Sequence, residues 1–362
     1  MAGIAKGHGM GMKVFDGHND FLLRLVEAPG RRRQIWLNGD GRGHLDLPRM
    51  RRAGFAGGFF AVYIPSPAEG DAAEVEALMA NPPYDLPLPE PVPLGTAQPF
   101  ALAMIGQLFW MERASEGAFR ICRTAAELRD CLNTGLIGAV LHFEGAEAIG
   151  PDLDALDAFH ALGLRSLGPV WSRPTAFGHG VPFRYPGSPD TGPGLSDAGK
   201  RLVEACNRLK IMIDLSHLNE AGFNDVAALS DAPLVATHSN AHALCPSTRN
   251  LTDRQLAMIA ETGGMVGLNF GAVFLREDGR NRAETGWEPV LRHLDYLIGK
   301  LGEDHVGFGS DFDGVTVPEV IGDVTGLLPM QEAMAAHGYG PALMAKLCHE
   351  NWVSLLERTW GE

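Results

Sequence analysis

Apolar residues gather in short runs that recur along most of the chain. Eight of these runs are rich in β-branched and aromatic residues and predict strands: 13–20, 57–64, 137–145, 164–171, 211–217, 233–240, 264–270 and 305–314. Several of them are almost continuously apolar, which is typical of strands that are buried on both faces of a sheet.

Helical periodicity appears between the predicted strands. In 196–209 the apolar residues recur at helical spacing behind Ser196, a residue type that caps helix N-termini. A second helix is predicted over 252–264, which opens on Thr252 and stops at a glycine pair. Two further stretches are amphipathic, at 284–301 and 341–358.

The alternation of strands and helices indicates the architecture. Neither a sequence repeat nor a long linker interrupts it. The pattern therefore predicts an α/β protein with a single catalytic (β/α)8 barrel domain over residues 1–362, and a doubly wound open sheet is the alternative. Residues 1–12 are expected to form a flexible N-terminal segment.

Two segments do not follow the alternation. The first, 81–95, is rich in proline and is expected to be loop or extended chain. The second, 178–194, is a long stretch with many glycines and prolines after the fourth predicted strand. Because loops of this length in compact domains are often functional, the second segment is a candidate part of a site.

Composition narrows the class of partner and the compartment. The 362 residues carry a net charge of −14, which argues against nucleic acid, since phosphate binding needs a basic surface. The start of the chain lacks the apolar core of a secretory signal, and no segment reaches the roughly 18 apolar residues of a membrane span. The cysteines are odd in number and show no C-x-x-C spacing, which favours reduced thiols in a cytoplasmic protein: Cys122, Cys131, Cys206, Cys245 and Cys348.

Ionisable side chains stand at the ends of several predicted strands: His18, Asp20, Glu144, His217, His238 and Asp311. In a barrel the carboxyl ends of all strands meet at one face, where active sites lie. Burying so many imidazoles and carboxylates there is costly without a charge partner, and a pair of divalent metal ions meets that need. Imidazole and carboxylate ligands suit zinc, and a carboxylate such as Glu144 can bridge two ions.

Several motifs resemble the successive signatures of the membrane (renal) dipeptidase family: "DGHND", "EGAEA", "GLSDAGKRLVEACNRLKIMIDLSH", "ATHSNAHALCPSTRNLTD" and "GFGSDFDG". The resemblance runs from about residue 14 to the C-terminal helix, and 207–253 is its most specific part. It implies a binuclear zinc peptidase on a (β/α)8 barrel that forms a homodimer.

The resemblance also implies metal ligands. His18 and Asp20 match the ligands of one Zn²⁺ ion, and Glu144 matches the carboxylate that bridges both ions. His217 and His238 match the ligands of the second Zn²⁺ ion.

Further positions match residues that act on the substrate. Arg249 matches the arginine that holds the free carboxylate of the substrate, and the neighbouring Asn250 is a candidate substrate-binding group. Asp311 matches the acidic residue that handles the proton, with Asp313 as an open alternative.

One position departs from the family pattern. Many relatives carry a histidine at the end of the fourth strand, where this chain has Trp171. An indole N–H donates a hydrogen bond but carries no charge. We expect Trp171 to contact the substrate, and His179 in the following loop is a hypothetical replacement for the missing histidine.

The function that the resemblance implies is hydrolysis of small dipeptides with a free C-terminal carboxylate, by attack of a metal-bridging hydroxide. Acceptance of a D-residue on the C-terminal side is left open. The alternatives are an N-acyl amino acid amidohydrolase and a non-catalytic, metal-bearing binder of small molecules.

Overall fold

The computed structural model describes residues 11–66 and 72–361, so most of the expected flexible segment 1–12 lies outside the described residues. The strands are β1 (Val14–Asn19), β2 (Phe55–Tyr63), β3 (Tyr84–Asp85), β4 (Phe119–Ile121), β5 (Ile137–Glu144), β6 (Leu164–Gly168), β7 (Arg184–Tyr185), β8 (Met212–Ile213), β9 (Val235–Ala236), β10 (Met265–Leu268) and β11 (Val306–Phe308).

The α-helices are α1 (Phe21–Glu27), α2 (Leu47–Ala53), α3 (Ala72–Met79), α4 (Leu94–Ala114), α5 (Ala125–Thr134), α6 (Asp154–Leu162), α7 (Asp197–Leu209), α8 (Glu220–Leu229), α9 (Asp253–Glu261), α10 (Ala272–Leu275), α11 (Trp287–Leu301), α12 (Leu327–His337), α13 (Pro341–Ala345) and α14 (Asn351–Trp360). Short 3₁₀ or π segments are η1 (Pro29–Arg31), η2 (Gln34–Asn38), η3 (Val324–Gly326) and η4 (Lys346–Glu350).

The main sheet is a barrel of parallel strands in the order β8-β6-β5-β2-β1-β11-β10-β9, with β4 paired to β5 outside this path. A single parallel bridge between Asp214 and Val235 joins the two ends, where the Leu215 N–H donates to the Val235 carbonyl at 2.8 Å. The predicted closed barrel is therefore confirmed, and the open-sheet alternative is wrong.

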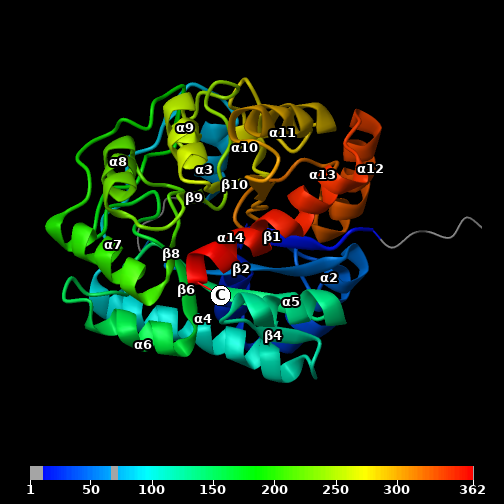
Figure 1. Ribbon diagram of the computed structural model, residues 1–362, viewed down its shortest axis with the longest axis horizontal. Coiled ribbons are helices and arrows are strands. Elements are labelled where there is room, and N and C mark those ends of the chain that lie inside the picture. The colour runs from blue at the N-terminus through cyan, green and yellow to red at the C-terminus, as the bar shows by residue number, and fades with distance from the viewer. Residues whose placement is uncertain (1–10, 67–71, 362) are drawn as a thin grey trace, which may run out of the picture.

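The helices lie around the outside of the strands (Figure 1). Every residue of β1, β2 and β5 is buried, which confirms the expectation of strands covered on both faces. In the part of the chain that the structure describes, no helix combines the length and apolar character that a membrane crossing requires.

The predicted helix starts are confirmed at two caps. The Ser196 side chain accepts the Gly199 N–H at the start of α7, and Thr252 forms a reciprocal capping box with Gln255 at the start of α9. The last predicted helix, 341–358, is interrupted, because the π segment η4 separates α13 from α14.

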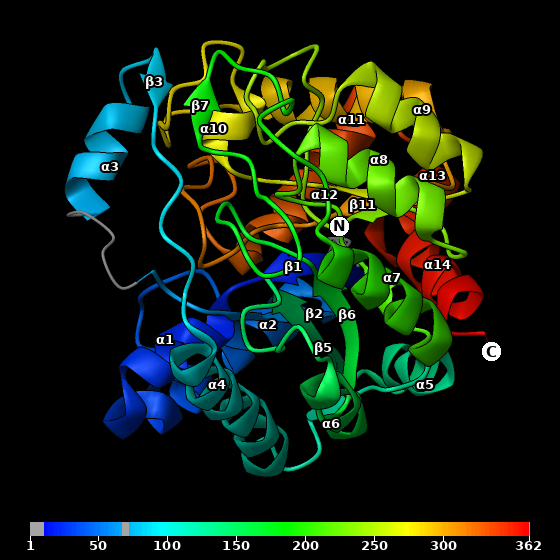
Figure 2. The same cartoon turned by 90° about the vertical axis from the view of Figure 1, so that its left-hand side faces the viewer.

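The two segments that broke the alternation pair with each other. β3 lies in the proline-rich segment and β7 in the glycine-rich one, and they form a small antiparallel sheet. The proline-rich segment is not entirely loop, since α4 already begins at Leu94. Figure 2 shows β3, β7 and α10 together at the upper left, at the opposite end of the view from α4. These pieces share an apolar cluster that includes Tyr84, Val273 and Phe274.

Candidate metal centre

His18 points from the end of β1 into a buried cluster of polar side chains. The side chain is fully buried, and neither ring nitrogen has a hydrogen-bond partner among residues 11–66 and 72–361. Its Nε2 lies 3.6 Å from Asp20 Oδ2 and 3.6 Å from Glu144 Oε1. Leaving two buried ring nitrogens unpaired is costly, so this ring is placed for a ligand rather than for packing.

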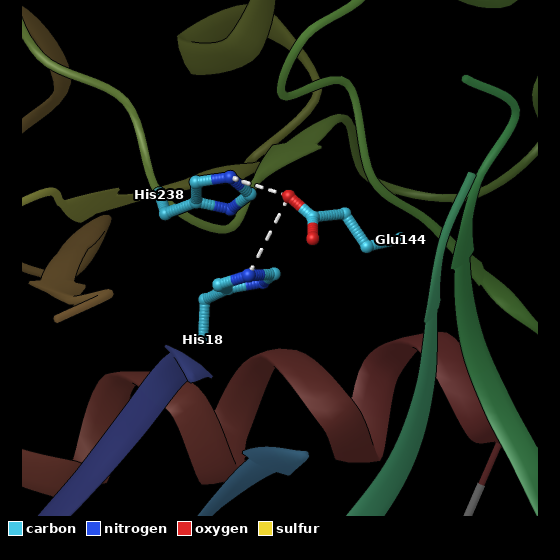
Figure 3. Close-up of side chains that lie close together, drawn as sticks. All are labelled: His18, Glu144 and His238. Atoms are coloured by element: carbon cyan, nitrogen blue, oxygen red, sulfur yellow. Dashed lines mark ion pairs between the residues drawn. The ribbon is translucent and has the colours of Figure 1, made fainter. Parts of the chain in front are cut away.

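Glu144, at the end of β5, brings three imidazoles together. Besides His18, its Oε1 lies 3.0 Å from His217 Nε2 and 3.6 Å from His238 Nε2. Figure 3 shows His18 and His238 both directed at this carboxylate. The Nε2 atoms of His217 and His238 are themselves 3.0 Å apart. One carboxylate oxygen thus faces three ring nitrogens that come from three different strand ends.

The chain fixes which nitrogen of His238 faces the cluster. The Thr237 hydroxyl donates its proton to Asp214 Oδ2 at 2.6 Å, so toward His238 Nδ1, at 2.8 Å, it can only accept. His238 therefore carries its proton on Nδ1 and turns an unprotonated Nε2 toward Glu144. The Nδ1 of His217 is likewise 2.8 Å from the Ser172 hydroxyl, so that its Nε2 is the nitrogen that faces Glu144.

Burial shifts the pKa values of these groups in opposite directions. Desolvation raises the pKa of the Glu144 carboxyl well above its usual range and lowers the pKa values of His217 and His238 well below theirs. At His18 burial also acts to lower the pKa, but attraction by Glu144 and Asp20 outweighs it and raises the pKa to about 10. The neutral imidazoles of His217 and His238, together with the crowded carboxylates, are donors that a divalent cation satisfies.

The donor atoms lie close enough together to hold a cation. Three overlapping buried sets, all of which include His18, keep their ligand atoms within 4.8 Å of one another: His18, Glu144 and His238; His18, Asp20 and Asp311; and His18, His142 and Asp214. His217 adjoins the first set through Glu144. The fold thus brings the five predicted metal ligands together.

Asp311 belongs to this cluster, whereas Asp313 does not. Asp311 accepts from Asn269 Nδ2 at 2.7 Å, and burial raises the pKa of its carboxyl to about 6. Asp313 instead pairs with Arg24 Nη1 at 3.3 Å and accepts the His44 N–H at 2.6 Å. Sequence reasoning missed Asn269, although it stands at the end of the predicted strand 264–270 and so carries the same signal as the other residues.

Arg249 places a buried guanidinium beside the cluster. It is only 4% exposed, its Nη2 donates to the His238 carbonyl at 3.3 Å, and its Nε has no partner among the described residues. Burial lowers the pKa of this group, and the nearby carboxylates of Asp311 and Glu144 oppose that shift. A cation with an unfilled donor at this place suits an anionic ligand.

The other predicted substrate-binding residues lie near the cluster in different ways. The side-chain amide of Asn250 donates hydrogen bonds to the Cys245 and Phe274 carbonyls, each at 2.9 Å. The Trp171 ring lies 5.8 Å from the His217 ring. The His179 carbonyl accepts the Asn219 N–H at 3.2 Å, and the hypothesis of a substrate role for its imidazole stays a prediction.

Comparison with known proteins places the chain among peptidases. A family model described as membrane dipeptidase, peptidase family M19, matches residues 10–360. The chain belongs to the membrane dipeptidase family. This dipeptidase is thus a metal-dependent hydrolase of peptide bonds, as the sequence motifs predicted.

Solved structures similar to this dipeptidase agree in fold. A metallo peptidase from Rhodobacter sphaeroides, liganded with a phosphinate mimic of the dipeptide L-Ala-D-Ala, is 71% identical with a TM-score of 0.96, covering 96% of this chain and 99% of its own. The metallo peptidase called dipeptidase AC is 70% identical with a TM-score of 0.95, covering 97% and 99%. An uncharacterized protein encoded in the pqqA 5′ region of Klebsiella pneumoniae is 48% identical over 261 residues, which are 72% of this chain and 95% of that protein.

Proposed function

We propose that this dipeptidase uses two zinc ions to hydrolyse small dipeptides that have a free C-terminal carboxylate, and that it accepts a D-residue on the C-terminal side. The observation that carries the proposal is the single Glu144 oxygen that faces three imidazole nitrogens within 3.6 Å. The dipeptide mimic bound to the 71% identical Rhodobacter sphaeroides enzyme supports the substrate class.

In this proposal His18 and Asp20 hold one ion, His217 and His238 hold the other, and Glu144 holds both. Zinc is the metal that best suits three imidazoles and two carboxylates. When bound, the ions supply Lewis acidity and lower the pKa of water into the neutral range.

The chain's own groups then bind the substrate and move the proton. The planar guanidinium of Arg249 binds the substrate carboxylate by two parallel hydrogen bonds. Asp311, whose pKa is raised to about 6, accepts a proton from the attacking water and gives it to the departing amine. Asn250 contributes a buried Oδ1 that has no partner among the described residues, and Glu144 acts in catalysis by holding both ions in place.

The test combines metal analysis with a substrate panel. Purified protein is expected to contain about two zinc ions per chain, and to hydrolyse L-Ala-D-Ala and L-Ala-L-Ala but not their C-terminal amides, which cannot ion-pair with Arg249. Turnover of N-acetylated amino acids alone would replace the proposal with an N-acyl amino acid amidohydrolase. Metal-loaded protein that is inert toward the whole panel would favour the non-catalytic binder.

The role of His179 has its own test. If its imidazole replaces the histidine that relatives carry at the Trp171 position, His179→Ala should lower kcat/KM for L-Ala-D-Ala. An unchanged kcat/KM would remove His179 from the site.

We further propose that the dipeptidase is a cytoplasmic homodimer. The five cysteines are buried free thiols, which supports folding in a reducing compartment, and the dimer rests on the family resemblance. Cell fractionation and the molar mass measured by light scattering would test the two statements separately.

A further inference from the structure

Three aromatic side chains connect the proposed carboxylate-binding group with the metal centre. Trp171 follows β6, Phe183 precedes β7 and Phe274 lies in α10, and we call them the aromatic wall. At one end, the Arg249 guanidinium lies over the Phe274 ring at 5.5 Å. At the other end, the His217 ring lies 5.8 Å from the ring of Trp171 and 6.4 Å from that of Phe183.

The wall is continuous between these two ends. The Phe183 ring stacks on Phe274 at 6.3 Å, and Trp171 packs against Phe183 edge to face at 5.6 Å. Phe274 is buried, while Trp171 and Phe183 are only partly buried, so part of each of these two residues is accessible from outside.

The rings are held from behind by buried partners. Trp171 contacts the Tyr63 ring at 5.1 Å, and the guanidinium of Arg173 lies 5.4 Å from its ring. Arg173 is fully buried and donates to Glu147 Oε1 at 2.7 Å, so its charge is already neutralised. It offers no counter-charge to a ligand in front of the wall.

The chemistry of a dipeptide decides which part of it meets the wall. The α-carbon of the C-terminal residue is bonded to the carboxylate on one side and to the scissile amide nitrogen on the other. Under the proposed function the carboxylate is held by Arg249 and the scissile carbonyl lies at the metal centre. The side chain of the C-terminal residue therefore starts between these two points, along the aromatic wall.

We propose that Trp171, Phe183 and Phe274 form the specificity site for the C-terminal residue and select a side chain without negative charge there. Aromatic rings give a desolvated surface whose faces carry partial negative charge, so a carboxylate loses water there without gaining a partner. Trp171 takes part because its neutral ring offers no charge that could pair with a carboxylate. The inference rests on the proposed function, since it uses Arg249 and the metal centre as the two anchors.

The test begins with the unmodified zinc-loaded protein. We expect kcat/KM for L-Ala-D-Ala to exceed that for L-Ala-D-Asp by at least about tenfold. If none of these peptides and none of their L,L counterparts is hydrolysed, the proposed function itself fails. If L-Ala-D-Ala is hydrolysed and L-Ala-D-Asp matches it, only the role of the aromatic wall is wrong.

The second part of the test places a positive charge in the aromatic wall. Phe183→Lys should raise the ratio of kcat/KM for L-Ala-D-Asp over L-Ala-D-Ala by about tenfold or more, and lower the ratio for L-Ala-D-Lys. The matched control is Phe109→Lys, which changes a partly buried phenylalanine of α4, and it should leave both ratios unchanged. Equal ratios in Phe183→Lys and the control would overturn the inference, and the measurement on the unmodified protein decides it if Phe183→Lys does not fold.

Discussion

Residues that touch no ligand decide how the histidines of the metal centre are presented. Asp214 is buried and accepts three hydrogen bonds, from the Ser216 N–H at 3.0 Å and from the Thr237 N–H and hydroxyl at 2.8 and 2.6 Å. Through the Thr237 hydroxyl it sets the tautomer of His238. Such outer partners of metal-binding histidines orient the ring and raise its basicity.

Asp214→Asn is expected to weaken metal binding. An amide nitrogen in place of Oδ2 cannot accept the Thr237 proton, so the hydroxyl can donate to His238 and favour the tautomer with the proton on Nε2. Zinc affinity, measured by competition with a chelator on folded protein, should fall about 10- to 100-fold.

Asp46→Asn is the control for this prediction, because Asp46 is also buried but caps α2. It should bind zinc as the unmodified protein does. Equal affinities in both variants would mean that Asp214 does not position His238.

The polar residues at the strand ends could be predicted as site residues from the sequence. They interrupt apolar runs, and barrel topology brings the ends of these runs together. The role of Asp214 could not be predicted, because this residue lies within the run 211–217 and resembles a turn residue. The roles of Phe183 and Phe274 could not be predicted either. Aromatic residues in loops and very short helices have no periodicity that distinguishes a ligand contact from core packing.

Secondary-structure elements were predictable where an apolar run or a capping residue marks them in the sequence. All eight barrel strands coincide with apolar runs, and the helices with capping residues begin where those residues stand. β3 and β7 have two residues each, too few for a pattern, and their pairing joins segments about 100 positions apart. α4 was not predicted, because Pro93 precedes it and Pro99 lies inside it.

The turn after β11 is an element whose shape serves the metal centre. A Cβ atom added at Gly314 would lie 2.1 Å from Asp20 Oδ2 and 2.5 Å from Asp311 Oδ1. Gly314→Ala is therefore expected to displace both carboxylates and to weaken zinc binding at least about tenfold, as measured by metal content after dialysis against a chelator.

Gly106→Ala is the matched control, since a Cβ at this position in α4 meets nothing within 4 Å. Alanine there should leave zinc content unchanged and stabilise the fold by about 0.5–1 kcal/mol. Zinc retention by Gly314→Ala equal to that of the control would show that the carboxylates do not need this space.

At the scale of the whole molecule, metal binding is linked to pH. In the metal-free chain the pKa of His18 is raised to about 10, that of Asp311 to about 6, and that of Glu144 well above its usual range. Protons that these groups hold near neutral pH must leave before the groups can bind a cation. His217 and His238 add nothing to this effect, because their lowered pKa values leave them already neutral.

We therefore expect zinc binding to release protons and to weaken as the pH falls. For each proton released, affinity should drop about tenfold per pH unit. Calorimetry at pH 7 in two buffers with different ionisation enthalpies should give different apparent heats. Identical heats, together with an affinity that does not change between pH 6 and 8, would contradict the linkage.

The closure of the barrel bears on the order in which the molecule comes apart. β8 and β9 have two residues each and meet through one bridge, so the seam between them has fewer backbone hydrogen bonds than the long contact of β2 with β5. His217 follows one side of that seam and His238 the other. A cation bound by the facing nitrogens of these two histidines would cross-link the two edges of the seam. The ion needed for catalysis would then also slow the separation of β8 from β9 when the barrel unfolds.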